Sequence, residues 1–405
     1  MSRSGVQALG AALVLCLAAG SRAAVPDAAT VHDRAIVLDA HADVPNPLDH
    51  PDAATTIDAG TQVDLDKLRA GGVDAIFLSV HAPQGPRTPE ATALARRIAD
   101  AKLAAIQAIA DRHPDQAAFA RSAADIRRIV GSGRTAIAAS MLNATPLGGD
   151  PHALRDFAGR GVLMLGFTHA GNNDYADSSR PFAHDKPGEN GGLSALGRET
   201  VSEANRLGVL LDVSQLSTPA LLQLTALTRA PVIASHSGVR TKVDNVRNLT
   251  DAELDAVART GGAVCIVAYS PYLHNFTQAE QAPTKAVLAR YGGLKNGYES
   301  LSPAQKEAFY KELEQAAPRA SLDDYVDSID YAVKRIGIDH VCLSTDFNHG
   351  FAAINGWTDE SEAPNVTAAL LRRGYDEQAI DKLWSGNLLR VLADAEAAGA
   401  GGAPK

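Results

Sequence analysis

The sequence predicts an α/β protein built as a (β/α)8 TIM barrel, and two observations support this. Apolar runs typical of strands alternate along the chain with segments of helical pattern. Several runs are nearly continuous Val, Ile, Leu and Ala, as expected of parallel strands buried on both faces. Eight such units fit a closed barrel, with a doubly wound open sheet as the alternative. The predicted strands are residues 36–40, 73–80, 135–141, 162–167, 209–213, 231–234, 263–269 and 340–344.

Amphipathic segments between the strands predict helices at 89–112, 194–207 and 250–260. The last opens with Thr250 and Asp251, a signal for a helix N-terminus. Segment 270–321 is a long insertion after the seventh strand. Long loops are usually functional or disordered, so we interpret it as a lid or as an oligomer contact that would allow a homodimer.

Composition is ordinary for a soluble globular protein, with 45% hydrophobic and 21% charged residues in a chain of 405. A net charge of −9 argues against nucleic acid as a partner. We assign residues 24–396 to a single barrel domain. The Gly/Ala-rich tail 397–405 is expected to be disordered.

The N-terminus, residues 1–23, has the pattern of a secretory signal peptide. Arg3 precedes an apolar stretch over 6–20, and Ser21-Arg22-Ala23 offers a cleavage site. The stretch is short for a membrane span, and no other apolar run reaches about 18 residues. We therefore expect an exported protein without a transmembrane segment after signal removal. It would be periplasmic or secreted, with membrane association through an uncleaved anchor as the alternative.

Three cysteines are present, and Cys16 would leave with the signal. Cys265 and Cys342 both lie in apolar strand-like runs, and we interpret them as two buried thiols. A disulfide is the alternative in an oxidising compartment, but spacing alone does not place two sulfurs at bonding distance.

His41 and Asp43 follow the first predicted strand and form the strongest candidate site. Alternate strand residues point the same way, so an imidazole and a carboxylate can face one cation. Such ligands suit a transition metal, most often zinc, and predict a metal-dependent hydrolase. In a barrel the active site lies where the strands end. Polar residues follow the other strands at His81, His169, Gln215, His236, Tyr269 and Asp346.

Each further candidate has an alternative reading. His236 is a metal ligand or a hydrogen-bonded core histidine. Asp346 is a ligand, a general acid and base, or a helix cap. His169 could donate a hydrogen bond to a developing oxyanion. Arg247 could pair with a substrate carboxylate or lie on the surface, and spacing does not separate the two.

Together, these residues and the sequence segments around them resemble the renal or membrane dipeptidase family of zinc metallopeptidases, peptidase family M19. The similarity runs in order from about residue 31 to 396. The segments that carry it are Asp39-Ala40-His41-Ala42-Asp43, Gln62-Val63-Asp64-Leu65, Gly71-Gly72-Val73, Thr168-His169, Asn172-Asn173, Gly192-Leu193-Ser194, Gly197-Arg198, Ser235-His236-Ser237, Arg247-Asn248-Leu249, Asp346-Phe347 and 386–391.

The resemblance implies a (β/α)8 barrel with two zinc ions and a bridging hydroxide that attacks the carbonyl of a dipeptide. It implies that His41 and Asp43 bind the first metal and His236 the second. His169 would contact the substrate near the scissile carbonyl, and Asp346 would handle the proton. Arg247 and Tyr269 would bind substrate.

Two positions depart from that family pattern. Leu142 stands where the family has a bridging glutamate, and Gln215 stands where it has a second-metal histidine. Leucine cannot ligate a cation, and the glutamine oxygen is a weak ligand for zinc. We therefore expect one zinc ion rather than two, held by a set drawn from His41, Asp43, His236 and Asp346. His81 is a speculative further ligand.

The predicted function is hydrolysis of small peptides or amides, most simply as a dipeptidase. Because Leu142 and Gln215 alter the metal site, two alternatives stay open. One is a binding or accessory protein that holds a peptide-like ligand without cleaving it. The other is a non-peptidase activity on a modified peptide.

Overall fold

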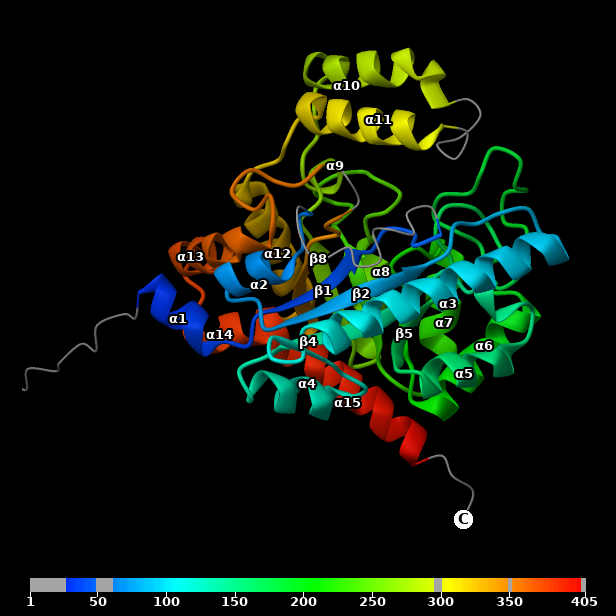
Figure 1. Cartoon of the computed structure of the whole chain (residues 1–405), viewed down its shortest axis with the longest axis horizontal. Helices are drawn as coiled ribbons and strands as arrows, with labels where there is room; N and C mark the ends of the chain where they lie inside the picture. The colour runs from blue at the N-terminus through cyan, green and yellow to red at the C-terminus, as the bar shows by residue number, and fades with distance from the viewer. Residues whose placement is uncertain (1–26, 49–60, 295–300, 349–351, 402–405) are drawn as a thin grey trace, which may run out of the picture.

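A ring of parallel strands forms the centre of the computed structural model, which describes residues 27–48, 61–294, 301–348 and 352–401. The ring follows the order β1-β2-β4-β5-β6-β7-β8-β9, and β3 pairs with β4 outside it (Figure 1). The predicted barrel is thereby confirmed, and all eight predicted strands are found. The strands are β1 Leu38–Asp43, β2 Ala75–His81, β3 Ala117–Phe119, β4 Thr135–Leu142, β5 Val162–Gly166, β6 Leu210–Asp212, β7 Val232–Ser237, β8 Ala263–Val267 and β9 Val341–Ser344.

The ring closes where β1 meets the segment that follows β9. The backbone N–H of Asp346 donates to the carbonyl of His41 at 2.9 Å, and that of Asp43 donates to the carbonyl of Phe347 at 2.8 Å. These two bonds join the first and last strands of the barrel at their carboxyl ends. The closure therefore brings together residues that lie about 300 positions apart in the chain.

Helices surround the ring, and their starts are encoded locally. Thr88 caps α3 with Pro89 in its first turn, and Thr250 forms a capping box with Glu253 at the start of α8. The helices are α1 Ala28–Arg34, α2 Leu65–Ala70, α3 Pro89–Arg112, α4 Ala123–Val130, α5 Leu154–Gly159, α6 Ala195–Leu207, α7 Thr218–Leu227, α8 Asp251–Arg259, α9 Ser270–Leu273, α10 Gln278–Arg290, α11 Pro303–Ala316, α12 Leu322–Ile336, α13 Ala363–Arg373, α14 Glu377–Asp381 and α15 Asn387–Ala400.

The core has two layers because alternate strand residues point in opposite directions. On β2, Ile76 and Leu78 belong to a cluster shared with the surrounding helices. Phe77 belongs to a second cluster, which also contains residues of α4 and α15. Both helices lie below the strands in Figure 1 and pack against one end of the barrel. The carboxyl ends of the strands are at the opposite end.

The insertion 270–321 contains α9 and then a hairpin of α10 and α11, which project beyond the ring of helices in Figure 1. The hairpin has a small apolar cluster of its own, made by Val287, Phe309 and Leu313. Its roles as lid or homodimer contact remain predictions.

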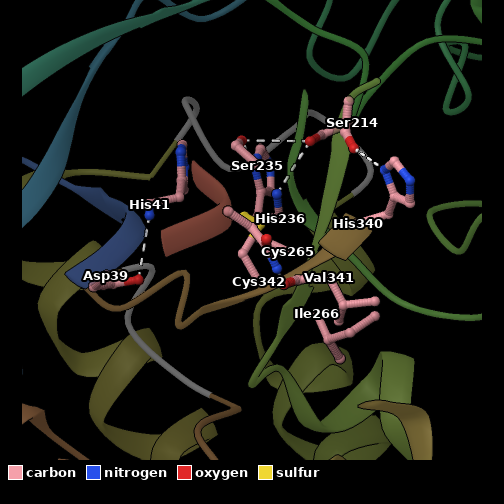
Figure 2. Close-up of a disulfide and its surroundings, with 12 residues drawn as sticks. Asp39, His41, Ser214, Ser235, His236, Cys265, Ile266, His340, Val341 and Cys342 are labelled. Atoms are coloured by element: carbon pink, nitrogen blue, oxygen red, sulfur yellow. Dashed lines mark hydrogen bonds between the residues drawn. A yellow bond between two sulfur atoms is a disulfide. The ribbon is translucent and has the colours of Figure 1, made fainter. Parts of the chain in front are cut away.

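Cys265 and Cys342 form a disulfide, so the interpretation as two buried thiols was wrong. The two residues are direct partners in the pairing of β8 with β9. The spacing of cysteines in the sequence does not reveal strand register, and register is what places these sulfurs side by side. Figure 2 shows the bond within the strands, close to His236.

The prediction of disorder for 397–405 was wrong for its first residues, because α15 continues to Ala400. Gly399 packs on the backbone of Gly208 so closely that an added Cβ would lie 2.4 Å from the Gly208 nitrogen. A glycine that suggested flexibility in the sequence is thus a contact point between α15 and the end of α6. Residues 402–405, like the predicted signal at 1–23, lie outside the described residues. Across the described ranges, no helix has the length and apolarity needed to cross a membrane.

Candidate active site

Every polar residue predicted to follow a strand lies at the carboxyl end of the barrel. His41, Asp43, His81 and His236 are within strands near their ends, and the others follow directly. Tyr269 precedes α9, two residues after β8. The barrel thus gathers these side chains at one face, as the sequence predicted.

His41 is the centre of the first group. Its Nε2 is buried and has no hydrogen-bond partner among the described residues. The Oδ1 atoms of Asp43 and Asp346 lie 3.9 and 3.7 Å from this nitrogen. Two carboxylate oxygens therefore lie within 4 Å of this imidazole nitrogen.

A buried carboxylate, Asp39, holds this group in place and was not singled out from the sequence. Its Oδ1 accepts from the backbone N–H of His41 at 3.2 Å and of Thr345 at 3.0 Å. Its Oδ2 accepts from the Thr345 hydroxyl at 2.6 Å. Burial raises the pKa of Asp39 to about 6. Asp39 therefore links the backbone of His41 to Thr345, the neighbour of Asp346, across the closure of the barrel.

Asp346 has a backbone φ of 60°, in the left-handed region that non-glycine residues rarely adopt. Such a conformation costs on the order of 1–3 kcal/mol and persists where surrounding contacts determine it. Here the contacts are the N–H of Asp346 on the carbonyl of His41 and the bonds from Thr345 to Asp39. The strained turn aims the carboxylate toward the imidazole of His41.

His236 lies beside His41, with ring centroids 4.0 Å apart and planes 17° from parallel. Its Nδ1 is 2.7 Å from the Ser235 hydroxyl, which is 2.5 Å from Oδ2 of Asp212. A hydroxyl has one hydrogen to donate, and the aspartate needs it. Nδ1 of His236 is therefore the donor to Ser235, and Nε2 is left as an acceptor. Figure 2 shows Ser214 and Ser235 beside this ring.

Gln215 satisfies that acceptor. Its Nε2 lies 3.1 Å from Nε2 of His236, and its Oε1 accepts from Arg180 at 3.3 Å. The pKa of His236 lies well below its usual value. Burial is the largest cause, and the neighbouring His41 is the next. The nitrogen that would face a second metal ion is thus engaged by the amide that replaces the expected histidine.

Leu142 fills the other altered position. It is buried at the end of β4, directly paired with His81 of β2. A Cβ at Gly166 would lie 3.1 Å from its Cδ1, so the glycine leaves space for the leucine. The ring of His81 lies 4.3 Å from that of His169, which places His81 beside His169.

Arg247 is only 2% exposed, so its interpretation as a surface residue was wrong. Its guanidinium donates to the backbone carbonyls of Ser214 and His236, the latter at 3.0 Å. These bonds direct both terminal nitrogens to the protein backbone. Tyr269 is buried beside Tyr272, with ring centroids 4.6 Å apart, and burial raises its pKa well above the usual value.

The predicted two-metal site has a first half, with His41 and Asp43, and a second half, with Leu142, Gln215 and His236. The side chains suit a metal ion differently in these two halves. Among the described residues, no three His, Cys, Asp or Glu side chains are arranged to hold a metal ion. In the second half the donors do not fit, because Leu142 has no ligand atom and His236 is bonded to Gln215. In the first half, Oδ1 of Asp43 and Oδ1 of Asp346 lie within 4 Å of Nε2 of His41, so the donor atoms are of types that zinc binds, although the three side chains are not arranged as a three-ligand site.

Comparison with known proteins agrees with the fold described above. The sequence model of the membrane dipeptidase family, peptidase family M19, matches residues 25–403. Dipeptidase tcpJ of Claviceps purpurea (strain 20.1) is 30% identical over 348 residues, 84% of this chain and 71% of tcpJ. The probable dipeptidase PvdM from Pseudomonas aeruginosa is 39% identical with a TM-score of 0.81, over 92% of this chain and 98% of PvdM.

A metallopeptidase from Rhodobacter sphaeroides, crystallised with a phosphinate mimic of the dipeptide L-Ala-D-Ala, has the same fold. It is 22% identical with a TM-score of 0.72, over 89% of this chain and 99% of its own.

Proposed function

This chain belongs to the membrane dipeptidase family, and we propose on that premise that it hydrolyses small peptides or amides, most simply dipeptides, at a site with one metal ion. Membership of a metallopeptidase family implies a metal cofactor. The observation that carries the proposal is the Nε2 of His41, which is buried, has no hydrogen-bond partner in the part of the chain that the structure describes, and lies within 4 Å of Asp43 and Asp346.

In this proposal His41 and Asp43 hold the ion, which we expect to be zinc. When bound, such an ion supplies an activated water and polarises the amide carbonyl. Asp346 faces the same imidazole and takes the proton of the attacking water, then returns it to the leaving amine. Asp39 holds His41 and Thr345 in the relative position that this proton transfer requires. His169 and Tyr269 are assigned to the substrate side of the site.

The test is turnover of a dipeptide panel by purified protein supplied with zinc, with products identified by mass spectrometry. We expect cleavage that is lost after chelation, restored by zinc, and abolished in His41→Ala. His152→Ala is the matched control, because its side chain is 63% exposed and remote from the site. Elemental analysis should give about one ion per chain, and full activity after exhaustive chelation would contradict the proposal.

A second function is favoured by the bond between Gln215 and His236, which makes half of the family's metal site unable to bind metal as it stands. The protein would then hold a peptide-like ligand without cleaving it. Thermal stabilisation by dipeptides without product at any added metal would support this function, whereas turnover of a single dipeptide would exclude it.

We also propose that the protein is exported. The sequence of residues 1–23 and the disulfide between Cys265 and Cys342 support this, since disulfides persist in oxidising compartments. Fractionation of the producing cells, with N-terminal sequencing of the recovered protein, should find a shortened chain outside the cytoplasm. A full-length chain confined to the cytoplasm would contradict export.

A further inference from the structure

Arg180 enters the site between two of the residues already described. Its Nη2 lies 3.4 Å from Nε2 of His169 and 3.3 Å from Oε1 of Gln215. The residue lies in the segment after β5 and is half-buried. Its Nε is buried and has no hydrogen-bond partner among the described residues. A guanidinium with an unpartnered N–H therefore stands beside the altered half of the site.

The directions of these bonds follow from the chemistry of the groups. A guanidinium has only donors, so both His169 Nε2 and Gln215 Oε1 must accept from it. His169 therefore does not present an N–H at this nitrogen. The group that can donate to an oxygen at this place is the arginine, not the histidine.

The other arginine of the site, Arg247, also has a buried Nε without a hydrogen-bond partner among the described residues. Both terminal nitrogens of Arg247 donate to backbone carbonyls of residues 214 and 236. Among the described residues, the hydrogen bonds of the Arg180 guanidinium go to the side chains of His169 and Gln215, both through the same nitrogen. Its remaining N–H groups belong to a positively charged guanidinium, which suits an anionic oxygen.

Resting on the function proposed above, we infer that Arg180 binds the oxygen that becomes negative at the scissile carbonyl of the ligand. It would supply positive charge at the half of the site where Leu142 and Gln215 exclude a metal ion. His169 and Gln215 act as positioning residues that orient the guanidinium. This inference predicts selectivity for ligands that carry a negative charge at that carbonyl position.

The experiment measures binding by calorimetry to zinc-supplied protein. The probes are the phosphinate mimic of L-Ala-D-Ala, which is anionic at the scissile position, and the matching ketomethylene dipeptide, which is neutral there. The variants are Arg180→Met and Arg180→Lys. Arg128→Met is the control, because Arg128 is 65% exposed and pairs with Asp125 on its own helix.

We expect Arg180→Met to weaken phosphinate binding at least tenfold, the usual size of a lost bond to a charged group, and to leave ketomethylene binding unchanged. Arg180→Lys, which keeps the charge without the fork of donors, should fall between wild type and Arg180→Met. A merely structural role would weaken both probes alike. If Arg180→Met does not fold, Arg180→Lys alone must show the loss specific to the phosphinate.

Two failures are distinguishable. Equal weakening of both probes, or unchanged phosphinate affinity in Arg180→Met, would overturn the inference about Arg180. Failure of the wild-type protein to bind either probe would instead overturn the proposed function on which the inference rests.

Discussion

The side-chain amide of Gln215 and the imidazole of His236 are joined by a hydrogen bond of 3.1 Å. Because Nδ1 of His236 donates to Ser235, the amide must donate and Nε2 must accept. The chain of bonds therefore runs in one direction, from Gln215 through His236 and Ser235 to Asp212. In the sequence, Gln215 suggested the loss of a metal ligand. In the structure, its side chain is part of a hydrogen-bonded network with His236, Ser235 and Asp212.

Gln215→Leu should destabilise the protein by about 1–3 kcal/mol, because it leaves the buried Nε2 of His236 without a donor. Urea unfolding monitored by circular dichroism measures this. Gln278→Leu, at an exposed position on α10, is the control for the change in side-chain chemistry. Equal stability of the two variants would mean that the Gln215 amide contributes little.

Asp346→Asn should lower kcat at least about 100-fold, the usual size of general acid–base catalysis, while KM changes little. The amide keeps the shape of the carboxylate but cannot take a proton at neutral pH. Steady-state kinetics on the best dipeptide of the panel gives both constants, with the exposed Asp66→Asn as control. An unchanged kcat would assign the proton transfer to another group.

Replacing both Cys265 and Cys342 by Ala should lower the free energy of unfolding by about 2–4 kcal/mol, since the bond closes a loop of 77 residues in the unfolded chain. Urea unfolding of oxidised wild type and the double variant measures the difference. Alkylation followed by intact-mass measurement establishes that the wild type contains the bond. Two alkylated thiols per folded wild-type chain would contradict it.

Asp74 should make the protein less stable as the pH rises from about 4 to about 6. Burial raises its pKa from 3.8 to about 6 while its Oδ2 accepts from the N–H of Val37. In this window the native carboxyl keeps its proton and the unfolded one has lost it, so raising the pH favours unfolding.

Asp74→Asn, which does not titrate, should therefore match wild type near pH 4 and exceed its stability by about 2–3 kcal/mol at pH 7. Urea unfolding at several pH values measures both. A constant difference between the two proteins from pH 4 to pH 7 would show that Asp74 does not titrate in this window.

Gly399→Ala should destabilise the protein by about 1–3 kcal/mol, although alanine favours helices over glycine. The added Cβ would meet the backbone of Gly208 at 2.4 Å, where neither chain can move aside cheaply. Gly401→Ala is the matched control, since its Cβ would meet its nearest neighbour at an ordinary 3.5 Å. Thermal unfolding compares the two variants. A Gly399→Ala protein at least as stable as the Gly401→Ala protein would disprove the close contact.

Long, apolar strands were the part of the fold that the sequence could predict, because burial on both faces leaves a continuous pattern. Ala117–Phe119 was missed, since three residues paired only with β4 leave no such pattern. At the site, strand ends predicted which residues gather at the mouth of the barrel. Arg180 was missed because it lies in an irregular segment with no motif, and only the folded loop brings it to His169.

Register and partner choice were beyond the sequence for a physical reason. The bond between Cys265 and Cys342 depends on how β8 aligns with β9, and the pairing of Gln215 with His236 depends on the alignment of β6 with β7. A list of candidate ligands cannot show that one of them is already hydrogen-bonded to its neighbour.

The barrel closes at the group proposed to be catalytic, because the N–H of Asp346 is bonded to the carbonyl of His41. The two residues are 305 positions apart in the sequence, so the ribosome adds Asp346 long after His41. No nascent chain shorter than about 346 residues can assemble the group, however well its earlier strands have folded. The group of side chains around His41 therefore forms only after the last strand of the barrel has been synthesised and has joined the first.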